Sequence, residues 1–351
     1  MIQPSAVLDA YFDEAAAQFM AARSNAGVGP DRDFQLAGQT LALRFAGPAL
    51  AGRILPAFGH HPSGDLPDPA LSVLLWDSAS TGTMLPPPPW GALDYHERGN
   101  MRAHDSERYS LSFDRPTDVF VAVDLKRRLG LFWTRDARQL PSFDTAAPLR
   151  RLLQGWLRSR QQFVVHAAAI GLPDGGLLLA GRGGSGKSTT AVRALFYDLQ
   201  YAGDDFCLVQ SEPTPRVHSL FNAAKLNRDV FERMPEFDTA VVNRDRLWRE
   251  KALIFVQEIF PERLIRTFPL LAIVMPRVAG TAASALTAAS PLQAYSAIGP
   301  DTVLRTLGDP RGTLTMLKAL VHRLPCYELA LGTNERGIRD ALHEVLQRSH
   351  G

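Results

Sequence analysis

Residues 177–189 read Leu177-Leu178-Leu179-Ala180-Gly181-Arg182-Gly183-Gly184-Ser185-Gly186-Lys187-Ser188-Thr189. The segment from Gly181 to Ser188 matches the pattern GxxxxGK[ST] at every fixed position. The apolar run before it is typical of a buried strand, and residues 189–199 after it favour a helix. A match between a strand and a helix predicts a phosphate-binding loop, or P-loop, within a βαβ unit.

The fixed positions of this loop have chemical reasons. Glycine adopts positive φ at little cost, so the backbone can turn its N–H groups toward phosphate oxygens. The N-terminus of the following helix adds a positive dipole at the same place. We expect Lys187 to reach the β- and γ-phosphates of ATP and Ser188 to place its hydroxyl on Mg²⁺. The predicted cofactors are therefore ATP and Mg²⁺, and the predicted nucleotide contacts run from Gly181 to Thr189.

Two adjacent acids, Asp204 and Asp205, follow about one helix and one strand later. Adjacent side chains at a strand terminus point in different directions, so one acid can face the metal while the other faces the nucleophile. His166 is a third candidate, within an apolar segment, residues 163–170, that we expect to be one strand. A lone histidine in an apolar strand is more often a core residue than a catalytic group.

Together, Val-Val-His166-Ala-Ala-Ala, the GxxxxGKS loop and Ala-Gly-Asp204-Asp205 resemble the catalytic domain of HPr kinase/phosphorylase. The resemblance is closer still to HPr-kinase-like serine kinases, some of which act in peptide modification. It covers residues 160–210 well and weakens to a general likeness over residues 215–345. It implies an α/β fold with a P-loop kinase core of the HPr-kinase/PEP-carboxykinase-like type.

The resemblance also implies roles by position. Asp205 would act as general base on the acceptor hydroxyl, Asp204 would lie near Mg²⁺, and His166 would assist the base. Adjacency alone leaves the roles of the two aspartates exchangeable. Lys225 and Lys251 are candidates for phosphate or substrate contacts. The family's downstream glycine-rich signature is not recognisable, so neither HPr as substrate nor a phosphorylase activity is expected.

The resulting hypothesis is an ATP-dependent kinase that phosphorylates a hydroxyl, foremost a serine, of a peptide or protein. The sequence does not separate this from a small-molecule kinase. Alternatives are a P-loop ATPase that drives a conformational change and a non-catalytic nucleotide-binding partner in a biosynthetic cluster. A GTPase is disfavoured because no NKxD motif occurs, and an ABC-type ATPase because no LSGGQ-like stretch occurs.

Residues 1–148 are expected to form an accessory α+β module, mainly antiparallel, and residues 149–351 the catalytic domain. The module's expected elements are a helix over 4–22, a loop over 84–90 that contains four prolines, and strands over 34–45 (with a turn at 38–39), 71–76, 108–113, 119–124 and 129–134. A short helix over 149–160 opens the catalytic domain. Toward the C-terminus we expect strands over 270–275 and 327–331 and helices over 313–323 and 335–347.

The composition of the 351 residues narrows the partners. With 38 basic and 36 acidic side chains, the charge balance gives no electrostatic argument for nucleic acid. Cys207 and Cys326 do not form a CxxC motif, and we expect them to be buried free thiols. The N-terminus lacks the pattern of a signal peptide and no apolar stretch approaches ~20 residues, so we expect a cytosolic protein without a membrane partner. The family resemblance is compatible with a homo-oligomer.

Overall fold

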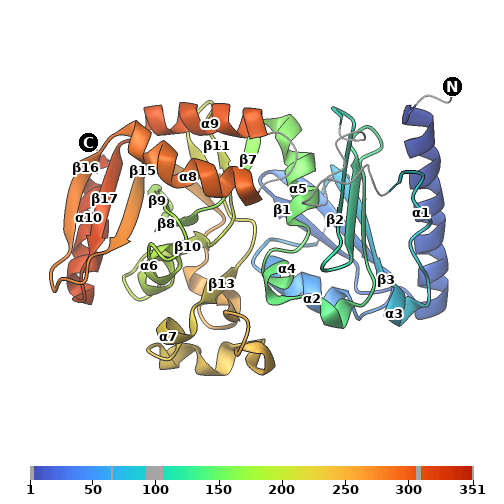
Figure 1. Cartoon of the computed structure of the whole chain (residues 1–351), viewed down its shortest axis with the longest axis horizontal. Coiled ribbons are helices and arrows are strands. Elements are labelled where there is room, and N and C mark those ends of the chain that lie inside the picture. Colours follow the sequence, from blue (N-terminus) through green and yellow to red (C-terminus); the bar gives the residue numbers. More distant parts are fainter. Residues whose placement is uncertain (1–3, 65, 92–105, 306–309, 350–351) are drawn as a thin grey trace. The chain divides into compact units, whose positions relative to one another are not determined.

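The computed structural model describes residues 4–64, 66–91, 106–305 and 310–349 and has a mixed α/β fold (Figure 1). The chain divides into two compact units, Met1–Ser159 and Arg160–Gly351. The boundary expected at residues 148 and 149 precedes helix α5 (Arg150–Leu157), whereas the units divide after it. The roles assigned to the two parts stay predictions. Among the described residues, no helix has the length and apolar character needed to cross a bilayer.

Unit 1 is built on one six-stranded sheet with the order β1-β2-β3-β6-β5-β4. Its central pairs, β2–β3 and β3–β6, are parallel, and the outer three pairs are antiparallel. Parallel neighbours need a long crossover connection. The segment between β2 and β3 provides one and contains a helix, α2. The strands are β1 (Arg32–Leu36), β2 (Gln39–Phe45), β3 (Leu71–Asp77), β4 (Tyr109–Asp114), β5 (Val119–Asp124) and β6 (Leu129–Thr134), and the short helices are α2 (Ala51–Ile54), α3 (Ser78–Thr81) and α4 (Ser142–Ala146).

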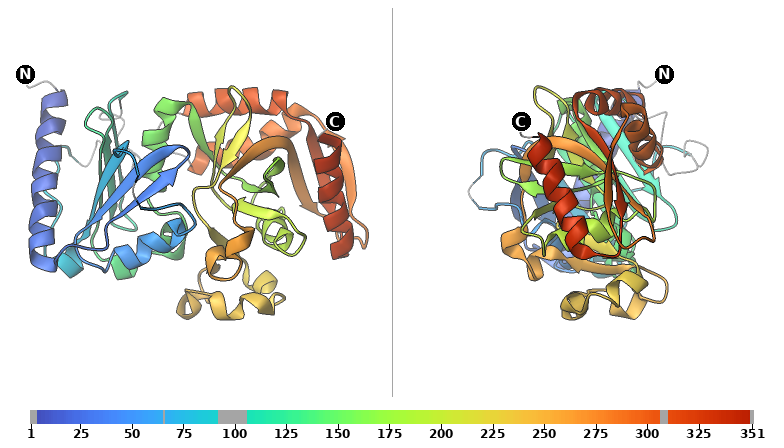
Figure 2. Two further views of the ribbon diagram at one scale, coloured as in Figure 1. Left: turned by 180° about the vertical axis from the view of Figure 1, so that it is seen from behind. Right: turned by 90° about the vertical axis from the view of Figure 1, so that its left-hand side faces the viewer.

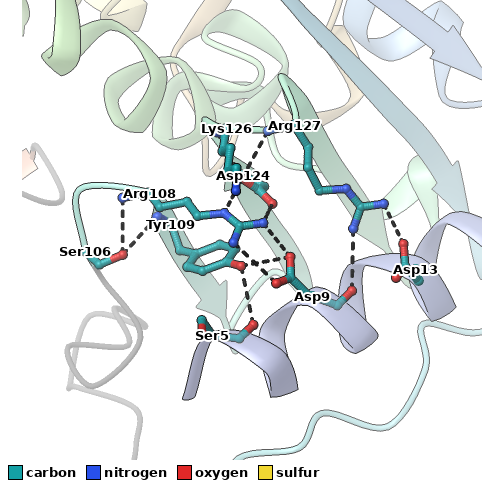
Figure 3. Close-up of polar contacts among 9 residues, drawn as sticks. All are labelled: Ser5, Asp9, Asp13, Ser106, Arg108, Tyr109, Asp124, Lys126 and Arg127. Carbon is teal, nitrogen blue, oxygen red and sulfur yellow. Dashed lines mark hydrogen bonds and ion pairs between the residues drawn. The ribbon is translucent and has the colours of Figure 1, made fainter. Parts of the chain in front are cut away.

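Helix α1 (Pro4–Ala26) extends beyond its predicted end and packs its apolar stripe into the core of unit 1. A polar contact holds the same helix at the sheet edge (Figure 3). The guanidinium of Arg108 lies 2.7 Å from the buried carboxylate of Asp124 and also pairs with Asp9 of α1. The hydroxyl of Tyr109 donates to Asp9 Oδ1 at 3.1 Å. The buried charge of Asp124 is thereby paired, as burial of a carboxylate requires.

Unit 2 contains a nine-stranded sheet whose longest strand is β15. The main path has the order β10-β8-β9-β15-β12-β11-β7, and β17 and β16 extend it from β15. β15 runs parallel to both β9 and β17. The strands are β7 (Gln162–Val165), β8 (Ala168–Leu172), β9 (Gly175–Leu179), β10 (Gln200–Gly203), β11 (Cys207–Gln210), β12 (Arg216–His218), β15 (Thr267–Val278), β16 (Ala285–Ala289) and β17 (Cys326–Leu331), beside a separate ribbon of β13 (Ala223–Leu226) and β14 (Ala252–Phe255).

Helices cover both faces of this sheet (Figures 1 and 2). Alternation along β9 explains the layers, because Leu177 and Leu179 join the core with α6 and α10, whereas Leu178 joins the core with α8 and α9. Three of these helices, α6, α9 and α10, were expected, and α8 was not. The helices are α6 (Lys187–Ala194), α7 (Arg228–Phe231), α8 (Pro291–Arg305), α9 (Pro310–Arg323) and α10 (Glu335–Ser349).

The expectation of one strand over residues 163–170 was wrong. The segment is divided into β7 and β8, and His166 and Ala167 lie in the break between them. β7 pairs with β11, whereas β8 pairs with β9 and β10, so the break lets the chain pass from one part of the sheet to another. The helix expected over residues 189–199 is shorter, since α6 ends at Ala194. Both cysteines are buried free thiols, as predicted.

Candidate active site

The GxxxxGKS loop connects β9 to α6. Its backbone conformation needs glycine at some positions more than at others. Gly181, Gly184 and Gly186 have φ values of 150°, 83° and 104°, a region that residues with side chains avoid. A Cβ on Gly186 would lie 2.6 Å from Leu331 Cδ1, and one on Gly181 would lie 2.6 Å from Ser185 Oγ. A Cβ on Gly183 would meet no heavy atom within 4 Å. The backbone shape therefore depends on Gly181, Gly184 and Gly186 more than on Gly183.

Lys187, the first residue of α6, is buried inside this loop. Its ammonium donates to the carbonyl oxygen of Gly181 and, at 3.2 Å, to that of Arg182. Burial lowers the pKa of Lys187, and the charges of Asp204, Asp205 and other acids counteract part of that effect. The lysine is thus the cation at the centre of the loop.

Ser188 and Asp204 form a contact between the start of α6 and the end of β10. The hydroxyl of Ser188 donates to Asp204 Oδ1 at 3.0 Å. Asp204 Oδ2 is also buried and has no hydrogen-bond partner in the part of the chain that the structure describes. Burial and then the charge of Asp205 raise the pKa of Asp204 above its usual range. The Ser188 hydroxyl and the unpaired carboxylate oxygen of Asp204 lie beside the GxxxxGKS loop. These groups fit Mg²⁺, which prefers oxygen ligands.

Asp205 faces different partners from Asp204. Its φ of 63° is in the left-handed region, which aspartate tolerates better than most residues. Lys225 Nζ lies 2.6 Å from Asp205 Oδ2, and His166 Nε2 lies 3.4 Å from Asp205 Oδ1. Burial opposes the ionisation of Asp205, but His166 and Lys225 outweigh it and hold the pKa of Asp205 below its usual range. The carboxylate is therefore ionised at neutral pH.

The structure separates the two candidate lysines. Lys225 lies on β13 and reaches Asp205. Lys251 is exposed at the residue before β14, where its carbonyl oxygen accepts a hydrogen bond from Asn243 at 2.9 Å. Within the described ranges, the ammonium of Lys251 makes no hydrogen bond or ion pair. The geometry therefore brings Lys225, and not Lys251, into contact with the acidic pair.

His166 is held in the break between β7 and β8 by residues of α8. Its backbone N–H donates to Thr302 Oγ1 at 3.0 Å, and its ring meets Phe206 edge-on at a centroid distance of 5.8 Å. Its Nδ1 lies 3.8 Å from Asp301 Oδ2. Burial lowers the pKa of His166, and Asp205 counteracts part of that effect. Asp301 and Thr302 were missed because α8 was not expected, and no local motif marks them.

The arrangement joins two chemical functions. On one side, the loop, Lys187 and the Ser188–Asp204 contact provide an anion cradle with oxygen ligands for a cation. On the other side, Asp205 is an ionised carboxylate paired with a lysine and placed against a histidine. Such a set can neutralise phosphate charge and accept a proton close by.

Comparison with known proteins gives little further information. No protein-family model matches the sequence, and no curated protein matches it. Among solved structures, the Hpr(Ser) kinase/phosphatase from Coxiella burnetii is similar, with 9% sequence identity and a TM-score of 0.31. The match covers 54% of this chain and 99% of that one. A similarity at this level carries no argument about function, which therefore has to come from the site.

Proposed function

We propose that this chain is an ATP-dependent kinase of the HPr-kinase-like type that transfers the γ-phosphoryl group to a hydroxyl, foremost a serine, of a peptide or protein. The observation that carries the proposal is the divergence of two adjacent carboxylates beside the loop. Asp204 pairs with Ser188, and Asp205 pairs with Lys225 and His166. An ATPase needs the first of these arrangements, whereas transfer to a hydroxyl also uses a second acid as base.

Each residue has a role in this proposal. Backbone groups of residues 181–189 and the ammonium of Lys187 would hold the triphosphate of ATP. Ser188 and Asp204 would hold Mg²⁺, which, when bound, neutralises charge on the transferring phosphoryl group. Asp205 would accept the proton of the acceptor hydroxyl, and Lys225 would contact a phosphoryl oxygen or the acceptor.

The protonation states agree with these roles. Because its pKa is lowered, Asp205 remains ionised and can accept a proton at neutral pH. His166 and Lys225 contact different oxygens of the carboxylate, so they fix its orientation from two sides. Phosphoryl transfer depends mainly on such positioning and on charge neutralisation.

The test is transfer from γ-labelled ATP to peptides and proteins encoded beside the gene, measured with the wild type and with Asp205→Asn. We expect Asp205→Asn to lower the transfer rate by about 10²–10⁴-fold, the usual contribution of a general base. ATP affinity should stay nearly unchanged, because the side chain of Asp205 pairs with Lys225 and His166 and not with Ser188 or Lys187. Asp229→Asn is a matched control, since Asp229 is exposed on α7 and forms an ion pair with Arg233.

Retention of most of the transfer rate by Asp205→Asn would show that the assignment of the base is wrong. Hydrolysis of ATP without transfer to any acceptor would instead favour an ATPase. Tight ATP binding with neither reaction would favour a non-catalytic nucleotide-binding partner.

A further inference from the structure

Helix α8 contacts His166 at two points through adjacent residues. The side chain of Thr302 is fully buried and accepts the backbone N–H of His166 at 3.0 Å. Asp301, one residue earlier, places Oδ2 3.8 Å from His166 Nδ1. The first contact fixes the histidine backbone to the helix, and the second brings a carboxylate to the far side of the ring.

The imidazole of His166 therefore lies between two carboxylates. Nε2 faces Asp205 at 3.4 Å, and Nδ1 faces Asp301 at 3.8 Å. An ionised carboxylate only accepts hydrogen bonds, so a neutral imidazole can donate to one of the two at a time, and both are satisfied only when the ring is protonated. Nδ1 is buried and has no hydrogen-bond partner among the described residues, which leaves the nearby charge of Asp301 as its polar neighbour.

The local sequence of α8 is unusual for a helix that only covers a sheet. Pro300, directly before Asp301, lies inside the helix. Proline in a helix interior removes one backbone hydrogen bond and costs about 3 kcal/mol, so this turn is not optimised for helix stability. Local rules are most often broken where a site needs a particular geometry.

We propose that Asp301 is a positioning residue that holds the His166 ring with Nε2 on Asp205, so that α8 forms part of the active site. Asp301 acts on the imidazole by charge, and the imidazole in turn orients the carboxylate that accepts the proton. A carboxylate beside one ring nitrogen restrains the orientation of the imidazole. The effect on catalysis rests on the proposed kinase function, whereas the effect on the ring does not.

The first experiment reads the ring directly in the full-length chain labelled with ¹⁵N-histidine. His166→Gln identifies the His166 signals among those of the nine histidines. We expect Asp301→Asn to shift both ring ¹⁵N resonances of His166. Asp340→Asn, the same change at an exposed position of α10, should leave them in place. Unchanged His166 resonances in Asp301→Asn would overturn the proposal, whether or not the protein is a kinase.

The second experiment measures phosphoryl transfer by a double-mutant cycle. We expect Asp301→Asn to lower kcat by about tenfold with little change in the KM for ATP, the size typical of a residue that orients another. Asp301→Glu should recover part of the loss. In a His166→Gln background, Asp301→Asn should have less than about a twofold further effect, because the two residues act as one unit.

An equal loss in both backgrounds would contradict a role through His166. If Asp301→Asn shifts the ring resonances but the wild type transfers no phosphate, the contact stands and the proposed function fails. The two experiments therefore separate an error about α8 from an error about the reaction.

Discussion

Two neighbouring carboxylates, Asp204 and Asp205, face different partners because the chain turns sharply between β10 and β11. Asp205 occupies the left-handed region, and the N–H of Phe206 donates to the carbonyl oxygen of Asp204 at 2.7 Å. This turn directs Asp204 to Ser188 and Asp205 to Lys225. A single tight turn is therefore enough to give two adjacent acids different chemical environments.

Two glycines of the loop give a matched pair of substitutions. We expect Gly186→Ala to reduce ATP affinity by at least about tenfold, because the new Cβ would meet Leu331 and the residue needs a positive φ. Gly183→Ala should change ATP affinity little, since the position is open and its φ is not in the left-handed region. Titration of a fluorescent ATP analogue measures both. Equal affinities of the two variants would contradict the loop geometry.

The sequence predicted part of this site. The other residues come together from distant parts of the chain, so their contacts could not be predicted. Spacing alone indicated the loop, Asp204 and Asp205, because these residues follow a strand–loop–helix pattern. It did not distinguish Lys225 from Lys251, since only strand pairing shows which ammonium reaches Asp205. Asp301 was not a candidate at all, because its contact with His166 spans many residues and leaves no local pattern.

At the scale of elements, the break between β7 and β8 decides how His166 is presented. In a continuous strand its N–H would belong to the sheet, whereas here it is bound by Thr302 of α8. The run of small apolar residues gave no sign of the break, since it fits a buried strand throughout. Helix α8 was missed because Gly299 and Pro300 interrupt its pattern. The strands expected in unit 1 and the last two helices have stronger patterns and are present.

The hydrogen bond from the His166 N–H to Thr302 of α8 can be tested by its effect on stability. We expect Thr302→Val to lower the free energy of unfolding by about 1–3 kcal/mol, because it leaves the buried N–H of His166 without an acceptor. Thr315→Val on α9 is the control, since Thr315 is exposed and its hydroxyl donates to the carbonyl oxygen of Arg311 in the same helix. Urea unfolding followed by circular dichroism measures both. Equal stabilities would mean that α8 does not hold His166.

At the scale of the whole molecule, each unit has a hydrophobic core of its own. In unit 1 one core lies between α1 and its sheet, and unit 2 has one core on each face of its sheet. All residues of the candidate site, from His166 to Asp301, belong to unit 2. Units with separate cores can fold separately.

We therefore expect residues 160–351, expressed alone, to unfold cooperatively and to bind ATP within about threefold of the full-length affinity. Calorimetric unfolding and ATP titration of the fragment and the full chain provide the comparison. A folded fragment without ATP affinity would place part of the nucleotide site in unit 1. The Lys187→Ala fragment is the control for non-specific binding.

The proposed kinase needs the loop and the Ser188–Asp204 contact to act together as one site for ATP with magnesium. The decisive measurement is isothermal titration calorimetry of the full-length protein with ATP, with Mg²⁺ and again with excess chelator. We predict one site per chain with Mg²⁺, weaker binding with chelator, and loss of this difference in Asp204→Asn. Absence of ATP binding in the presence of Mg²⁺ would show that the loop and the Ser188–Asp204 contact do not form such a site.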